Sequence, residues 1–113
     1  MTDKELLELA AKAAGIELLC EEFKEGFKEG FIYYYYKIAD DTQGWNPLNN
    51  DGDALRLAVK LGLVVDTFVE TDGGYAIAST AEIFDEEPLG NDPYAATRRA
   101  IVRAAAEIGR GME

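Results

Sequence analysis

Three stretches of the chain place apolar residues at the three-to-four-residue spacing of an amphipathic helix. They span residues 2–15, 50–62 and 92–109. The first opens with the Thr-x-x-Glu spacing of a capping box, and the third opens with an Asp-Pro pair typical of a helix start. A glycine stands near the end of each, where helices commonly terminate. In the second helix the pattern predicts that Asp53, Arg56 and Lys60 point outward. The predicted buried stripe consists of Leu55, Ala58, Val59 and Gly62, broadened by Leu57 and Leu61.

Shorter apolar runs between these helices predict about four strands. The predicted strands are Ile16–Cys20, Phe31–Ile38, Leu63–Glu70 and Gly74–Thr80. The last two form a hairpin across a Gly-Gly turn. Residues 40–50 read as a turn-rich connection, and residues 85–90 read as an acidic loop.

The resulting order predicts one α+β domain covering residues 1–113. We expect a four-stranded, mainly antiparallel sheet packed with three helices. The pattern leaves open whether the helices cover one face of that sheet or both.

Two local patterns lie in the second predicted strand and just before it. Residues 23–26 read Phe-Lys-Glu-Gly and are repeated at once by residues 27–30, which suggests a duplication in a loop or at a hairpin end. Four consecutive tyrosines follow at residues 33–36. Side chains alternate along a strand, so Tyr33 and Tyr35 should face one side and Tyr34 and Tyr36 the other. We expect one side to be covered and the other to be wet.

The amino-acid composition limits the kinds of binding and catalysis that we expect of this chain. The chain has 22 acidic and 11 basic residues, and this net charge of −11 opposes binding to nucleic acid or to anionic membranes. It has no histidine, which argues against zinc enzymes and imidazole acid–base catalysis, and Cys20 is its single cysteine. We expect no cofactor, no metal site and no catalytic residues. The acidic N-terminal helix and the absence of a long apolar run predict a cytosolic protein.

Three segments resemble a set of small phage and prophage proteins, the phage ABA-sandwich family. They are the opening helix at residues 2–16, the Trp-Asn-Pro-Leu turn with its helix at residues 45–62, and the last helix at residues 91–109. Together they cover about half the chain. The resemblance implies a sheet with helices on its faces and a non-essential accessory role in the host cytosol. It brings no catalytic residues with it.

Arg98 is the first candidate for a binding role. It falls within the apolar arc of the last helix, whereas Arg99, Arg103 and Arg110 lie on the polar side with Glu107. An arginine aimed into a core must snorkel, pair with a carboxylate or meet an anion. A structural salt bridge is the favoured interpretation, and an anion site is the alternative.

Tyr33, Tyr34, Tyr35, Tyr36 and Trp45 are the other candidates. The tyrosine strand would suit a protein interface or a dimer contact, because tyrosine gives large contact area with a polar tip. Its simpler interpretation is a half-buried strand. Trp45 is expected to close the edge of the core, with a ligand-lining role as the alternative.

Two acidic clusters are not expected to do chemistry. Residues 49–53 have the oxygen ligands of a calcium loop without its register, and they read as a helix cap. The pairs at residues 40–41 and 86–87 read as solvated charge. The sequence therefore predicts a non-catalytic protein that works by binding. A protein partner is the first choice, a small anion or nucleotide held by Arg98 and aromatic residues the second, and a homodimer the third.

Overall fold

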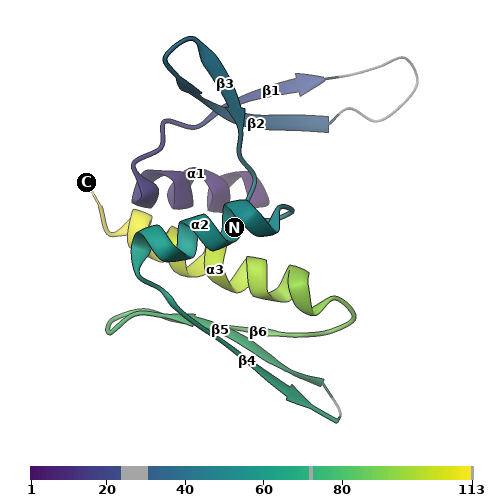
Figure 1. Ribbon diagram of the computed structural model, residues 1–113. Coiled ribbons are helices and arrows are strands. Elements are labelled where there is room, and N and C mark those ends of the chain that lie inside the picture. The colour runs from purple at the N-terminus through teal and green to yellow at the C-terminus, as the bar shows by residue number, and fades with distance from the viewer. Residues whose placement is uncertain (24–30, 72, 113) are drawn as a thin grey trace.

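The computed structural model describes residues 1–23, 31–71 and 73–112. These residues form three helices and two separate sheets, whose arrangement can be followed in Figure 1. The elements follow one another as α1 (Asp3–Ala14), β1 (Leu19–Phe23), β2 (Phe31–Ile38), β3 (Asp41–Gly44), α2 (Asp51–Leu61), β4 (Val64–Glu70), β5 (Gly73–Ser79), β6 (Phe84–Pro88) and α3 (Pro93–Arg110). The α+β class is confirmed.

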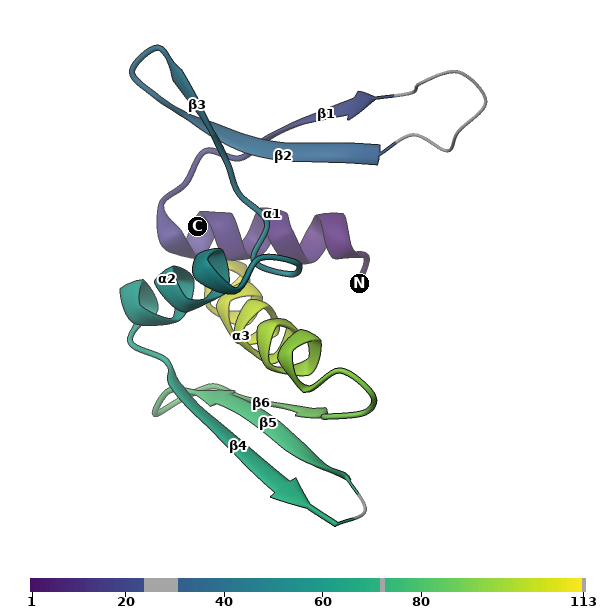
Figure 2. The same ribbon diagram turned by 45° about the vertical axis from the view of Figure 1, so that its right-hand side comes forward.

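The expectation of one four-stranded sheet was wrong. The first sheet has the order β1-β2-β3 and the second has the order β4-β5-β6, and both are antiparallel. The helices form a middle layer with one sheet on each side (Figures 1 and 2). The chain leaves the first sheet through α2 before it enters the second, so the two groups of strands never meet. This layer order differs from the sheet between helices that the family resemblance implies.

The helix termini follow their sequence signals. Thr2, Asn50 and Asp92 are the N-caps, and each accepts a hydrogen bond from the backbone N–H three residues on. Gly15 and Gly62 end α1 and α2 in the left-handed conformation, which glycine adopts without strain.

Two strands were missed, and one was misplaced. β3 and β6 fall in the segments predicted as a connection and an acidic loop. Both are short and polar and lack a clear apolar alternation, and each pairs with the strand before it in the sequence. β1 begins at Leu19, three residues later than predicted. β2, β4 and β5 match the prediction closely.

Small side chains bring α3 close to both of its neighbours. Its buried residues are mostly alanines, and they pack α3 against α1 on one side and against β5 and β6 on the other. Ala76 and Ala78 are the fully buried residues of β5 that meet this helix. A Cβ at Gly109 would lie 1.9 Å from the Leu9 carbonyl oxygen, so α1 and α3 pack with backbone near backbone.

Helix α2 buries only part of the predicted stripe. Leu57 and Ala58 enter the core as predicted, whereas Leu55 and Val59 are exposed. Asp53, expected to point outward, is buried. It accepts hydrogen bonds that fix the preceding turn, which offset the free-energy cost of burying its charge.

The tyrosine strand alternates as predicted. Tyr34 is buried against the helices, and Tyr36 packs on the same core. Tyr33 is exposed on the opposite face, where its ring stacks on Tyr35 with 5.6 Å between ring centroids. The Phe-Lys-Glu-Gly duplication falls largely at residues 24–30, outside the described part of the chain.

Candidate functional site

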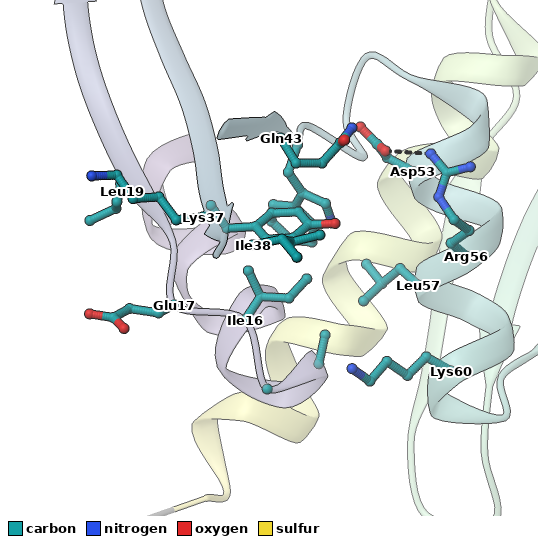
Figure 3. Close-up of a pocket in the computed structure, with 14 residues that line it drawn as sticks. Ile16, Glu17, Leu19, Lys37, Ile38, Gln43, Asp53, Arg56, Leu57 and Lys60 are labelled. Carbon is teal, nitrogen blue, oxygen red and sulfur yellow. Dashed lines mark hydrogen bonds and ion pairs between the residues drawn. The ribbon is translucent and has the colours of Figure 1, made fainter. Parts of the chain in front are cut away.

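A cavity of about 950 Å³ lies between the first sheet and the helices α1 and α2. That volume falls within the range of small-molecule sites, about 300–1,000 Å³. Its walls come from the end of α1, from β1, β2 and β3, and from one side of α2 (Figure 3). Residues far apart in the sequence therefore meet around one space.

The apolar part of the wall is aromatic and aliphatic. Tyr36 and Trp45 contribute the aromatic surface, and Ile16, Ile38 and Leu57 contribute branched aliphatic surface. Trp45 is only 6% exposed, and its backbone N–H donates to the Tyr34 carbonyl at 3.0 Å. The predicted role of Trp45 at the core edge and the alternative role beside a ligand are thus compatible with one position.

A buried carboxylate fixes the turn beside the cavity. One oxygen of Asp53 accepts from the backbone N–H of Asn46 at 3.0 Å, and the other binds the guanidinium of Arg56 at 2.7 Å. The Asn46 side chain in turn accepts from the Leu48 backbone N–H at 3.0 Å. These bonds hold the turn that carries Trp45 against the N-terminus of α2.

Three basic residues border the cavity. Arg56 is already paired with Asp53, as Figure 3 shows. Lys37 follows Tyr36 on β2, so its side chain lies on the outer side of the sheet, and Figure 3 shows it extending away from the space. The Lys60 side chain extends from α2 toward the space, and within the described part of the chain no carboxylate lies within 4.0 Å of its ammonium group. Glu17, also a wall residue, is exposed and points away from the space in Figure 3. The cavity thus offers one positive charge without a carboxylate partner among the described residues, in a chain of net charge −11.

The sequence did not mark Lys60 as a site residue. It is an exposed basic residue on an ordinary helix, so nothing in its sequence neighbourhood distinguishes it. Only the placement of the first sheet over α2 brings Lys60 beside Tyr36 and Trp45.

Arg98 lies outside this cavity, and its side chain donates hydrogen bonds to two protein groups. Its side chain is 16% exposed; its Nε donates to the Leu48 carbonyl at 2.8 Å and its Nη1 to the Asp51 carboxylate at 2.7 Å. These bonds join α3 to the turn before α2. This geometry matches the structural salt bridge that was favoured for Arg98, and Arg98 does not line the cavity beside Trp45.

The four tyrosines divide between two environments. Burial is the main cause that raises the pKa of Tyr34, followed by the nearby Cys20, Asp3 and Glu8. The hydrogen bond that Tyr35 donates to Glu21 at 2.9 Å raises the pKa of the Tyr35 phenol. Both phenols therefore stay neutral at physiological pH. Of the four, Tyr36 lines the large cavity.

The second sheet presents an apolar and acidic outer face. Paired strand residues face the same side, so the outer face follows from the register. It carries Val64, Asp66, Phe68, Tyr75, Ile77, Phe84, Glu86 and Pro88. Its large aromatic residues are exposed. The sequence has eight acidic residues and no lysine or arginine between Leu61 and Thr97, so this face is uniformly negative.

The inner side of β6 carries paired acids. Arg103 binds Glu87 at 2.9 Å and lies 3.9 Å from Asp85. Burial raises the pKa of Asp85, and Arg103 partly opposes that shift. Glu87 is therefore half of a partly buried ion pair, which corrects the prediction that residues 86–87 are solvated charge.

Among the described residues, no group of three or more potential ligand side chains is arranged to hold a metal ion. None of the described helices has the length and apolar content needed to cross a bilayer. No family model, curated protein or solved structure matches the chain.

Proposed function

We propose that the protein is a non-catalytic binding protein and that its cavity takes a small amphipathic anion. The ligand would have one carboxylate or phosphate group on an apolar or aromatic body. One observation carries this proposal: the Lys60 ammonium group, which has no carboxylate partner within the described residues, faces a space lined by Trp45 and Tyr36. The setting suggested by the family resemblance, the host cytosol during phage infection, belongs to the same proposal.

The net charge of the protein makes Lys60 informative. A protein of net charge −11 repels anions at long range, so anions do not gather on its surface unaided. Beside low-dielectric walls, a lysine acts on a nearby anion more strongly than it does in open water. One ammonium group next to an apolar wall matches the two parts of an amphipathic anion.

This proposal differs from the sequence-based alternative in its residues. Arg98 is no longer proposed as a ligand-binding residue, because its guanidinium group already donates hydrogen bonds to the Asp51 carboxylate and the Leu48 carbonyl. Trp45 stays, and Lys60 and Tyr36 join it.

The single tryptophan makes a direct test. Trp45 is the only tryptophan, so a ¹⁵N-labelled sample gives one indole N–H resonance, and that resonance reports on the cavity wall. We would titrate indole-3-acetate and its neutral amide, indole-3-acetamide, which differ by one charge. The acetate should shift the resonance in a saturable way. It should bind about 5–10 times more tightly than the amide, because one partly screened ion pair is worth about 1 kcal/mol.

Lysine variants show whether the charge preference belongs to the cavity. Lys60→Met should abolish the preference for the acetate. Lys37→Met is one control, because the Lys37 side chain points away from the cavity. Lys4→Met is the other, because Lys4 lies on α1 and pairs weakly with Glu8. Equal binding of acetate and amide to the unchanged protein would refute the proposal. So would an equal loss of preference in Lys4→Met.

A protein partner is a second candidate function, favoured by the outer face of the second sheet. Exposed aromatic residues surrounded by carboxylates, with no basic residue nearby, fit a partner that presents apolar groups among lysines and arginines. This is the partner class that the sequence placed first, moved from the tyrosine strand to β4–β6.

The two outer faces can be compared in one experiment. Protein captured from infected-host lysate would be identified by mass spectrometry for the unchanged chain, for a Phe68→Ser, Phe84→Ser variant, and for a Tyr33→Ser, Tyr35→Ser variant. Loss of one partner only in the Phe68 and Phe84 variant would support docking on the second sheet. Loss only in the tyrosine variant would favour the first sheet instead.

A further inference from the structure

Strand β4 is an edge strand of the second sheet, and much of it is uncovered on both sides. Val65, Thr67 and Val69 share the side of Ala76 and Ala78, the side that α3 covers. The helix lies over β5 and β6 and barely reaches β4, so all three residues are exposed, Val69 by 81%. Val64 and Phe68 are exposed on the other side. Apolar side chains left open on both sides of one strand are unusual for a free edge.

The hydrogen-bonding direction of this edge follows from β5. The Leu89 N–H donates to the Gly74 carbonyl at 3.0 Å, and the Thr80 N–H donates to the Ile83 carbonyl at 2.8 Å. Even-numbered residues of β5 therefore face the β6 side, and its odd-numbered residues face β4. Tyr75 and Ile77 are paired with Phe68 and Asp66. It follows that the backbone groups of Val65, Thr67 and Val69 point away from the sheet.

The other edges carry features that prevent strand pairing. β6 has three consecutive acidic residues and ends at a proline. β1 has two consecutive glutamates, and β3 is only four residues long. Charge, proline and shortness are the usual means by which proteins keep sheet edges apart. β4 has seven residues, five of them Val, Thr or Phe, and no proline.

We propose that β4 pairs antiparallel with β4 of a second copy, with Thr67 on the two-fold axis. Pairing about Thr67 uses the whole strand. Val65 then lies opposite Val69 of the second copy, and Asp66 lies opposite Phe68. The three outward-facing residues of each copy form the hydrogen-bonded pairs, about six N–H···O bonds in all. The two second sheets become one six-stranded sheet.

Charge selects this register among the neighbouring ones. The two-fold axis keeps the same face of the sheet on the same side in both copies. A shifted register that preserves this symmetry therefore places the axis on a neighbouring residue, either Asp66 or Phe68. A centre at Asp66 places two Asp66 carboxylates directly opposite each other. A centre at Phe68 places Asp66 opposite Glu70 twice. Like charges directly opposite destabilise a strand pair, and the Thr67 register has none.

Association and its site can be tested by mass measurement in solution. Light scattering with size exclusion should give a species of twice 12.4 kDa as the concentration rises. Val69→Lys should abolish that species and leave the circular dichroism spectrum unchanged, because Val69 is exposed in the single copy. Val59→Lys is the matched control; Val59 is 73% exposed on α2, and the same substitution there should leave the dimer intact.

Disulfide trapping tests the register. In a Cys20→Ser background, Thr67→Cys places two cysteines opposite each other at about 5.5 Å between Cα atoms, within disulfide reach. Asp66→Cys and Phe68→Cys place theirs diagonally, about 7–8 Å apart, near or beyond that reach. Thr67→Cys should therefore form the cross-linked dimer fastest under mild oxidation.

Two results would overturn the inference. One is a single copy at every concentration up to about 0.5 mM, where only contacts weaker than about 4.5 kcal/mol escape detection. The other is a dimer that Asp66→Cys or Phe68→Cys traps as fast as or faster than Thr67→Cys. Neither result bears on the cavity, because β4 contributes no residue to it.

Discussion

The two sheets pack against the same helical layer in opposite ways. The second sheet meets α3 through Ala76 and Ala78, so the strand and helix backbones lie close together. The first sheet reaches the helices through Tyr34, Tyr36 and Trp45, whose length holds its strands away from α1 and α2. The size of the side chains at an interface thus decides whether two layers pack without a gap or leave a cavity between them.

The same contrast divides the roles of the sheets. The distance between the first sheet and the helices gives this sheet an inner cavity with Lys60 in its wall. The second sheet packs on α3 through alanines, and its distinguishing features are an outer face and a free edge. We therefore propose ligand binding at the first sheet and macromolecular contacts at the second.

The attachment of the first sheet should depend most on Trp45. Replacing it with alanine removes the largest side chain between β3 and α2, and truncation of a buried aromatic residue costs about 3–5 kcal/mol. Chemical denaturation should show a loss of that size. A loss below about 1 kcal/mol would mean that the first sheet is held by other contacts.

A larger side chain should affect the two interfaces unequally. Ala76→Leu forces bulk between β5 and α3 and should reduce the free energy of unfolding by about 1–3 kcal/mol. Tyr36→Trp enlarges a cavity-lining residue with open space beside it and should change stability by less than about 1 kcal/mol. Thermal denaturation of both variants makes the comparison, and equal losses would contradict it.

Arg98 should contribute stability and not ligand affinity. Arg98→Met leaves the Leu48 carbonyl without its donor and should cost roughly 1.5 kcal/mol in a denaturation experiment. Asp51→Asn removes only the exposed partner of Arg98 and should cost less. Binding of indole-3-acetate should be the same in Arg98→Met and in the unchanged protein. A specific loss of anion binding would restore the sequence-based alternative.

Asp85 should give the smallest effect, visible as a pH dependence. Its pKa is raised above the ordinary 3.8 in the folded state, so the folded protein holds this proton more tightly than the unfolded chain. The favourable contribution is complete below pH 3.8 and is lost as the pH rises through the folded pKa. Asp85→Asn should therefore raise the melting temperature at pH 7 relative to the unchanged protein and have little effect near pH 3. A lower melting temperature at pH 7 would show that the ion pair with Arg103 outweighs burial.

Local signals in the sequence determined much of the secondary structure. Caps, turns and strand alternation depend on neighbours within a few residues. The sequence therefore predicted the N-caps Thr2 and Asp92, the glycines that end α1 and α2, the hairpin of β4 and β5, and the alternation of the tyrosines. For α2 it left Asn50 and Asp51 as alternatives, and Asn50 is the cap.

Tertiary pairing could not be predicted in the same way. β3 and β6 are polar strands that exist because an adjacent strand accepts them, and adding them turned an expected sheet of four strands into two sheets of three. Arg98 was placed correctly on its helix, but its partner Asp51 lies 47 residues away among many acids. Lys60 has no distinguishing sequence neighbours, so its place in the cavity could be found only once the first sheet was seen to lie over α2.

Hydrogen–deuterium exchange with and without indole-3-acetate tests the contrast between the sheets most directly. We predict that amides of β2 and β3 exchange faster than those of β5 in the free protein and that the ligand slows β2 and β3 while leaving β5 and β6 unchanged. Equal protection of the amides of both sheets in the free protein would contradict the account. So would a ligand effect in which amide exchange slows in other strands and is unchanged in β2 and β3.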